Sequence, residues 1–166
     1  MCPWNRSEKH MALEIERKFL VRDDAWRSAA IGEHYRQGYL STLPDRTVRV
    51  RVIADAGYLT IKGATVGAAR TEYEYVIPVE DAHAMLDNLC LRPLIEKTRH
   101  TLEDRGLTWE IDEFEGENAG LVIAEVELES EDQDITLPMW VGEEVTGDPR
   151  YYNANLVANP YCNWGR

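Results

Sequence analysis

The 166-residue sequence has no hydrophobic run that approaches the ~20 apolar residues of a membrane-spanning helix. Its three cysteines (Cys2, Cys90 and Cys162) are scattered and lack the CxxC spacing of a zinc site. This usage fits free thiols in a reducing compartment, so we expect a cytoplasmic protein without a disulfide framework. The polar N-terminus lacks the apolar core of a signal peptide, and we expect residues 1–10 to be a flexible leader. Residues 11–166 are then expected to form a single domain.

Positive charge is also scarce. Asp and Glu number 30 against 18 Lys and Arg, which gives a formal net charge of -12. A surface this negative repels nucleic acid and anionic membranes, so an anionic ligand must bind where Lys and Arg are concentrated locally. No glycine-rich phosphate loop precedes a helix, which excludes P-loop and Rossmann sites. No nucleophile–base pair of the Ser–His type stands out either.

Instead, alternating side chains predict a chain dominated by strands. In residues 13–22, Glu14, Glu16 and Lys18 share one face of a strand and Phe19 falls on the other. Further strands are expected over 34–43, 47–54, 58–63, 70–77, 94–102, 107–114 and 121–129. Helices are expected from Asp23 to near Gly32, over 80–91, and after Pro149. A strand, a helix and three strands therefore occur twice.

On most of these strands the charged residues recur in one parity, whereas the other parity is apolar. The basic members are Lys18, Arg49, Arg51, Lys62, Arg70, Lys97 and Arg99. The acidic members are Glu14, Glu16, Glu72, Glu74, Glu110, Asp112, Glu125, Glu127 and Glu129. A sandwich with a solvated charged face is one interpretation. Because the set is rich in Arg and Glu and lacks Ser, Gln and Asn, we favour a closed barrel of about eight antiparallel strands with the charges inside.

The chemistry of such an interior favours a polyphosphate ligand. Lys and Arg bind phosphate oxygens, and Arg adds bidentate geometry. Several carboxylates at close range repel one another unless a hard divalent cation such as Mg²⁺ or Mn²⁺ lies among them. The carboxylates would hold the metal, the metal and the basic groups would neutralise the phosphates, and a water would attack in line.

These motifs resemble the CYTH domain family, the triphosphate tunnel metalloenzymes, and most of all its short bacterial inorganic triphosphatases. The ExExK signature of the family is present as Glu14-Ile-Glu16-Arg-Lys18, within the run EIERKFLV. The other matching elements are Gln37-Gly38-Tyr39-Leu40, Arg49/Arg51, Lys62, Arg70-x-Glu72-x-Glu74, Glu96-Lys97-Thr98-Arg99, Glu110/Asp112, Glu125/Glu127 and the tail from Glu144 to Asn153. The resemblance covers about residues 12–158.

The resemblance implies an α+β fold, an eight-stranded antiparallel β-barrel (tunnel) from a duplicated β-α-β-β-β unit, with helices packed outside and a short C-terminal helix. It implies a metal-dependent triphosphatase that hydrolyses inorganic triphosphate (tripolyphosphate) to pyrophosphate and phosphate, with Mg²⁺ or Mn²⁺ as cofactor. The residues implied to grip the triphosphate are Lys18, Arg49, Arg51, Lys62, Arg70, Lys97 and Arg99. Those implied to hold metal are Glu14, Glu16, Glu72, Glu74, Asp112, Glu125 and Glu127. The implied catalytic group is Glu14, Glu16 and Lys18, in which one carboxylate of the Glu14/Glu16 pair orients the attacking water.

Other functions stay open on the sequence alone. A thiamine triphosphatase, a nucleoside triphosphatase or a class IV adenylyl cyclase would need an aromatic platform for the organic group. Trp26, Trp109 and Trp140 are candidates, although we expect them to pack in the core. A non-catalytic polyphosphate-binding module is another class, but the implied metal-binding carboxylates are all present. The expected partner is a small-molecule triphosphate, without nucleic acid or membrane, and a homodimer is an open alternative.

Overall fold

The computed structural model describes residues 15–66, 69–130 and 132–165; the expected leader (1–10) and Glu14 lie outside the described residues. The strands are β1 (Ile15–Val21), β2 (Ile31–Leu43), β3 (Arg46–Ile53), β4 (Ala56–Val66), β5 (Ala69–Ile77), β6 (Ile95–Asp104), β7 (Leu107–Phe114), β8 (Val122–Leu128) and β9 (Val141–Glu144). The helices are α1 (Val79–Asn88) and α2 (Asn153–Ala158), with 3-10 turns η1 (Ala25–Ser28), η2 (Gly116–Asn118), η3 (Pro149–Tyr151) and η4 (Tyr161–Asn163). In the described part of the chain, none of the helices has the length and apolar character needed to cross a membrane.

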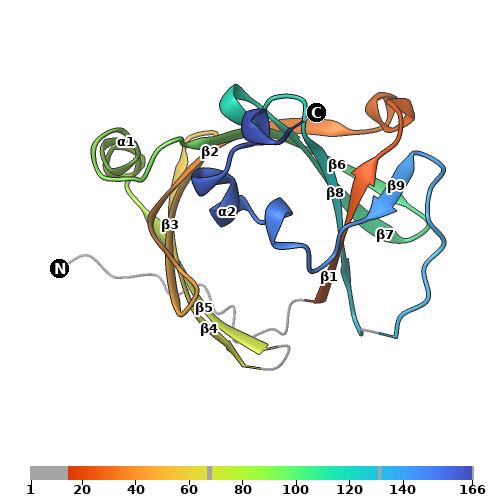
Figure 1. Cartoon of the computed structure of the whole chain (residues 1–166), viewed down its shortest axis with the longest axis horizontal. Helices are drawn as coiled ribbons and strands as arrows, with labels where there is room; N and C mark the ends of the chain where they lie inside the picture. Colours follow the sequence, from red (N-terminus) through yellow and green to blue (C-terminus); the bar gives the residue numbers. More distant parts are fainter. Residues whose placement is uncertain (1–14, 67–68, 131, 166) are drawn as a thin grey trace.

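The strands form one antiparallel sheet in the order β5-β4-β3-β2-β6-β7-β8-β1-β9, which curls into a ring in Figure 1. Without β9, the sheet consists of two halves, β1 to β4 and β5 to β8, that are related by symmetry about the β2–β6 pair. If each strand of the first half is exchanged with the corresponding strand of the second (β1 with β5, β2 with β6, β3 with β7 and β4 with β8), the same order is obtained in reverse. The symmetry confirms the duplicated unit that the sequence predicted. The described sheet keeps two edges, β5 and β9, so it is not strictly closed.

Two elements differ from the sequence-based expectation. The additional ninth strand, β9, pairs with β1 opposite Phe19, where Glu144 also accepts two hydrogen bonds from the Arg17 guanidinium at 2.6 and 2.9 Å. The helix expected from Asp23 to Gly32 is only the short turn η1. It is short because β2 already begins at Ile31, whose backbone pairs with Thr101 of β6.

Most apolar side chains of the outward parity are buried on the outside of the ring, although Tyr73 and Tyr75 of β5 are exposed. Trp26 of η1 and Trp109 of β7 belong to one cluster, together with Trp140 from the segment before β9. A second cluster joins Val50 of β3 to Leu86 of α1, and Figure 1 shows α1 outside the ring. The three tryptophans are 1%, 0% and 7% exposed, so they pack in the core as expected.

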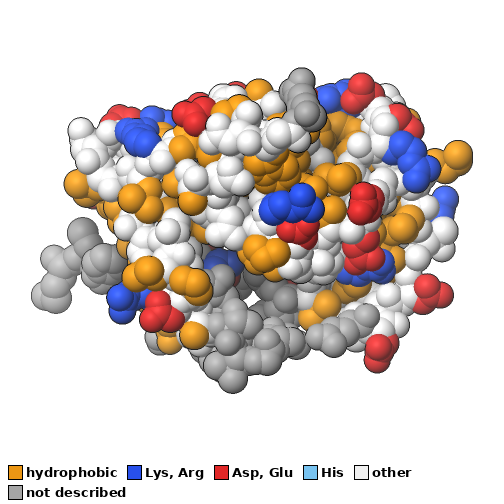
Figure 2. All heavy atoms as spheres, in the orientation of Figure 1, with side chains coloured by type: hydrophobic (Ala, Val, Ile, Leu, Met, Phe, Trp, Pro, Cys, Tyr) orange, Lys and Arg blue, Asp and Glu red, His pale blue; other side chains and the backbone are white. Residues whose placement is uncertain are grey.

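The C-terminal helix α2 lies inside the ring (Figure 1). Its Leu156 and Val157 are buried in a third cluster with Tyr39, Ile95 and Ile123, which come from β2, β6 and β8. In the space-filling view, side chains fill most of the ring that the ribbon leaves open (Figure 2). The inner face of the sheet is therefore apolar where α2 covers it, and the charged residues occupy the remainder.

Candidate active site

The register of the sheet places the predicted charged residues on the inner face of the ring. Directly opposite residues of an antiparallel ladder share a face. The inner-face pairs include Lys18–Glu125, Glu16–Glu127, Glu110–Glu125, Arg99–Asp112, Lys97–Tyr35, Gln37–Arg51, Arg49–Thr60, Thr60–Glu74 and Lys62–Glu72. Among the predicted residues, Glu14 lies outside the described part of the chain. The Arg70 backbone belongs to β5, but its side chain is likewise outside the description, and Glu129 lies beyond the end of β8.

Ion pairs centred on Asp112 hold the wall formed by β6, β7 and β8. Arg99 donates hydrogen bonds to both carboxylate oxygens of Asp112 at 2.7 Å, and the Lys97 ammonium donates to Oδ2. Lys97 is 2% and Asp112 is 1% exposed. Burial alone would raise the pKa of Asp112, but the two cations hold that pKa well below its usual range. Asp112 therefore stays ionised and fixes the two cations in place.

Lys18 connects β1 to the same wall. Its ammonium donates to Glu125 and lies 2.6 Å from a Glu16 carboxylate oxygen. Burial alone would lower the pKa of Lys18, but these two carboxylates outweigh burial and raise it. Arg99 Nη2 also donates to Glu125, at 3.0 Å. Glu16 stands directly opposite Glu127, and such a pair of like charges is destabilising without a counter-charge.

The wall formed by β3, β4 and β5 has more hydrogen-bond donors than acceptors around Arg49 and Arg51. Nη2 of Arg51 and Nη2 of Arg49 lie 3.2 and 3.5 Å from the same oxygen of Glu74, which also accepts a 2.8 Å bond from Thr60. Burial and the positive charge of Arg49 both lower the pKa of Arg51. Among the described residues, the buried Nε atoms of both arginines have no hydrogen-bond partner. Farther along this wall, Lys62 forms an ion pair with a carboxylate of β5 at 2.6 Å.

Strand β2 lies between the two walls and contributes uncharged side chains to the inner face. They are Tyr35, Gln37 and Tyr39, by their pairing with inward residues of β3 and β6. The guanidinium carbons of Arg51 and Arg99 lie 5.6 and 5.5 Å from the Tyr35 ring centroid, so this ring contacts one arginine from each wall. The sequence argument followed charge, so it assigned none of these residues to the site, although Gln37 and Tyr39 belong to an element that matches the family. The alternation of side chains along residues 34–43 would have placed Tyr35, Gln37 and Tyr39 on one face of the strand.

The carboxylates at the β1–β8 pair have the chemistry of a divalent-metal site. Glu16, Glu125 and Glu127 supply carboxylate oxygens, the ligands that Mg²⁺ and Mn²⁺ prefer. Within residues 15–66, 69–130 and 132–165, no group of three or more His, Cys, Asp and Glu already has a metal-binding arrangement. The donor set nevertheless fits a divalent cation, because Glu16 and Glu125 share the single ammonium of Lys18 as a counter-charge, and Glu127 adds a third carboxylate directly opposite Glu16.

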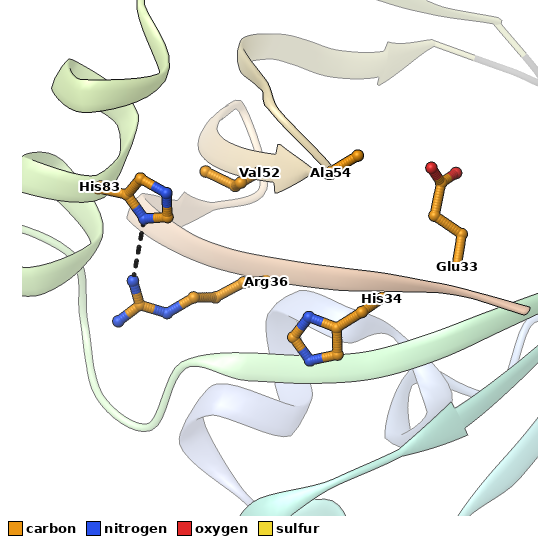
Figure 3. A pocket seen from close by; sticks show the side chains of 6 residues that line it. All are labelled: Glu33, His34, Arg36, Val52, Ala54 and His83. Atoms are coloured by element: carbon orange, nitrogen blue, oxygen red, sulfur yellow. Dashed lines mark hydrogen bonds between the residues drawn. The ribbon is translucent and has the colours of Figure 1, made fainter.

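A separate cavity of about 290 Å³ lies on the outside of the ring, between α1 and the strands β2 and β3 (Figure 3). Its lining residues are Glu33, His34, Arg36, Val52, Ala54 and His83. In Figure 3 the Arg36 side chain points toward His83, 3.4 Å away. Arg36 also forms ion pairs with Asp87 at 2.6 Å and Glu96 at 3.3 Å, so its charge is already neutralised. The inner face of the ring is therefore the better candidate for an anion site.

Comparisons with known proteins give a consistent result. The family model of the CYTH domain matches residues 12–161. An inorganic triphosphatase of Acetivibrio thermocellus is 56% identical over 154 residues, which cover 93% of this chain and 99% of the relative. An inorganic triphosphatase of Nitrosomonas europaea is 40% identical over 152 residues, covering 87% and 96%. The crystal structure of an inorganic triphosphatase superposes with a TM-score of 0.68 at 36% identity, covering 89% of this chain and 96% of its own.

Proposed function

Because the chain belongs to the CYTH domain family, we propose that the inner face of its sheet binds inorganic triphosphate and hydrolyses it to pyrophosphate and phosphate. Relatives at 56% and 40% identity over most of the chain are inorganic triphosphatases. The similarity spans both walls of the ring.

One observation carries this proposal from the structure itself. Arg49 and Arg51 share a single oxygen of Glu74, and their buried Nε atoms lack an acceptor among the described residues. Buried N–H groups without acceptors are rare in native proteins because each costs about 1–3 kcal/mol. A phosphate chain has several anionic oxygens in a row, so it can accept from both guanidinium groups at once.

In the proposed complex, the inward cations bind phosphate oxygens from two sides. They are Lys18, Lys97 and Arg99 on one wall, and Arg49, Arg51 and Lys62 on the other; the family resemblance adds Arg70, whose side chain lies outside the description. Asp112 keeps Lys97 and Arg99 in position. Glu16, with Glu14 before it in the sequence, accepts a hydrogen bond from the water that attacks the terminal phosphorus. A new P–O bond forms to this water while the bond to the bridging oxygen breaks, which releases phosphate and pyrophosphate.

Hydrolysis also requires relief of negative charge, and the family implies a divalent metal for this purpose. On the described inner face, carboxylates are at least as numerous as cations, so a bare triphosphate would be repelled by much of the surface. Glu16, Glu125 and Glu127 would hold the metal, with Glu72 and Glu74 as the acidic groups of the other wall. Bound Mg²⁺ or Mn²⁺ would neutralise the phosphate oxygens.

The aromatic residues support an inorganic rather than an organic triphosphate. The tryptophans that could stack on a base, Trp26, Trp109 and Trp140, are buried in the outer cluster. The ring of Tyr35, on the inner face, is already in contact with two guanidinium groups. A nucleoside or thiamine moiety would therefore gain little from these side chains.

Phosphate release from three substrates tests this function. Tripolyphosphate, ATP and thiamine triphosphate are each incubated with the wild-type protein and Mg²⁺ or Mn²⁺, and in parallel with excess chelator. We expect release from tripolyphosphate to be fastest and to stop when the metal is chelated. Faster release from ATP or thiamine triphosphate would overturn the inorganic substrate, and no release from any of the three would overturn the hydrolase activity.

A further inference from the structure

Gln37 is an uncharged residue at the centre of the inner face. It lies near the middle of β2, directly opposite Arg51 of β3 and Ile95 of β6. Its side chain is 1% exposed. Ile95 and the nearby Tyr39 belong to the cluster that α2 covers. Gln37 therefore stands at the boundary between the charged part of the inner face and the part closed by α2.

Among the residues that the structure describes, the amide nitrogen of Gln37 has no hydrogen-bond partner. The side-chain atoms in this condition, among the described residues, are Gln37 Nε2, Arg49 Nε, Arg51 Nε, Trp26 Nε1 and His100 Nε2. Gln37, Arg49 and Arg51 are neighbours on the paired strands β2 and β3, and the register of these strands places all three on the inner face. Such a concentration of buried donors, all lacking acceptors, indicates a place for an oxygen-rich ligand.

We propose that Gln37 Nε2 donates a hydrogen bond to a non-bridging oxygen of the bound triphosphate, beside the oxygens that Arg49 and Arg51 bind. This inference rests on the proposed function and adds a neutral binding residue to the charged set. A neutral donor binds the phosphate without a further change of charge on the inner face. It therefore depends on the position of the oxygen more than on the net charge of the ligand.

Because the Gln37 amide is buried, a phosphate can reach it only when a neighbouring side chain moves. Arg51 is the cross-strand neighbour of Gln37. The bond from Arg51 to Glu74 is 3.2 Å long, whereas charge-assisted bonds of this kind are usually about 2.7–2.9 Å. A phosphate oxygen can compete with so long a bond, which would move the guanidinium onto the ligand and uncover the amide.

Substitution by methionine separates a binding role from a structural one. Gln37→Met keeps the unbranched shape and removes the unpartnered donor. Because Nε2 donates no hydrogen bond to the described residues of the free protein, the melting temperature should stay the same or rise. The dissociation constant for tripolyphosphate with Mg²⁺, measured by calorimetric titration, should rise about three- to tenfold. Gln37→Glu should raise it further, because a carboxylate of the same shape repels phosphate.

Gln133→Met is the matched control, since this glutamine lies in the segment after β8 and accepts a bond from the Glu129 backbone. It should leave the dissociation constant unchanged. A Gln37→Met protein that melts at a lower temperature and binds tripolyphosphate as tightly as the wild type would overturn the inference while leaving the proposed function intact. A wild-type protein that binds no tripolyphosphate would overturn both.

Discussion

Glu16→Ala is expected to lower the turnover of tripolyphosphate about a thousandfold, which corresponds to about 4 kcal/mol of transition-state stabilisation. The same substitution should leave the melting temperature unchanged or raise it. The Glu16 side chain is 43% exposed and stands opposite Glu127, so its removal relieves a repulsion between like charges. Lys18 keeps its other carboxylate partner, Glu125.

Turnover and thermal unfolding of the purified variant check this expectation together. Glu117→Ala provides the control, because Glu117 is exposed in η2 and carries the same change of charge. It should behave as the wild type in both measurements. Retained turnover combined with a lower melting temperature for Glu16→Ala would show that Glu16 is structural instead.

Asp112→Ala, unlike Glu16→Ala, is expected to lower the stability of the protein strongly. Removing one member of a buried ion pair typically costs about 3–5 kcal/mol, because the partner charge is left buried and uncompensated. Here the 2% exposed Lys97 would lose its ion-pair partner, whereas Arg99 would keep Glu110 and Glu125. The loss would be a large share of the roughly 5–15 kcal/mol that stabilises a typical domain.

Urea unfolding of Asp112→Ala, Asp112→Asn and Glu117→Ala measures this difference. Asp112→Asn keeps the shape of the side chain and remains measurable if the alanine variant fails to fold. It should lose less stability than the alanine variant but clearly more than Glu117→Ala, for which we expect a change within about 0.5 kcal/mol. Wild-type unfolding free energies for both Asp112 variants would contradict the anchoring role.

The contrast between these two carboxylates illustrates how far the sequence could be interpreted. Strand parity correctly placed Glu16 and Asp112 on one face, because side chains alternate strictly along a strand. Strand parity does not show, however, how deeply a side chain is buried or which charges surround it. Both residues were assigned to the metal-binding set, and only the pairing of β7 with β6 shows that Asp112 is enclosed by Lys97 and Arg99.

Errors in the predicted elements have similar physical causes. The capping residue Asp23 and the apolar Trp26 favoured a helix, but pairing of Ile31 with β6 outweighed local propensity and left one short turn. The short strand β9 is held by the edge of β1 and by Arg17, contacts that the local sequence does not reveal. The position of α2 inside the ring depends on apolar inward residues from three distant strands.

Binding of tripolyphosphate to matched arginine variants tests the central claim, that the inner face of the ring is a triphosphate site. Arg51 and Arg46 lie on the same strand, but Arg51 faces inward, whereas Arg46 is exposed at the strand end with the opposite parity. Calorimetric titration with Mg²⁺ should give a dissociation constant at least about tenfold higher for Arg51→Met than for the wild type. Arg46→Met removes the same charge and should bind as the wild type does. Equal weakening in both variants, or no binding by the wild type, would contradict the claim.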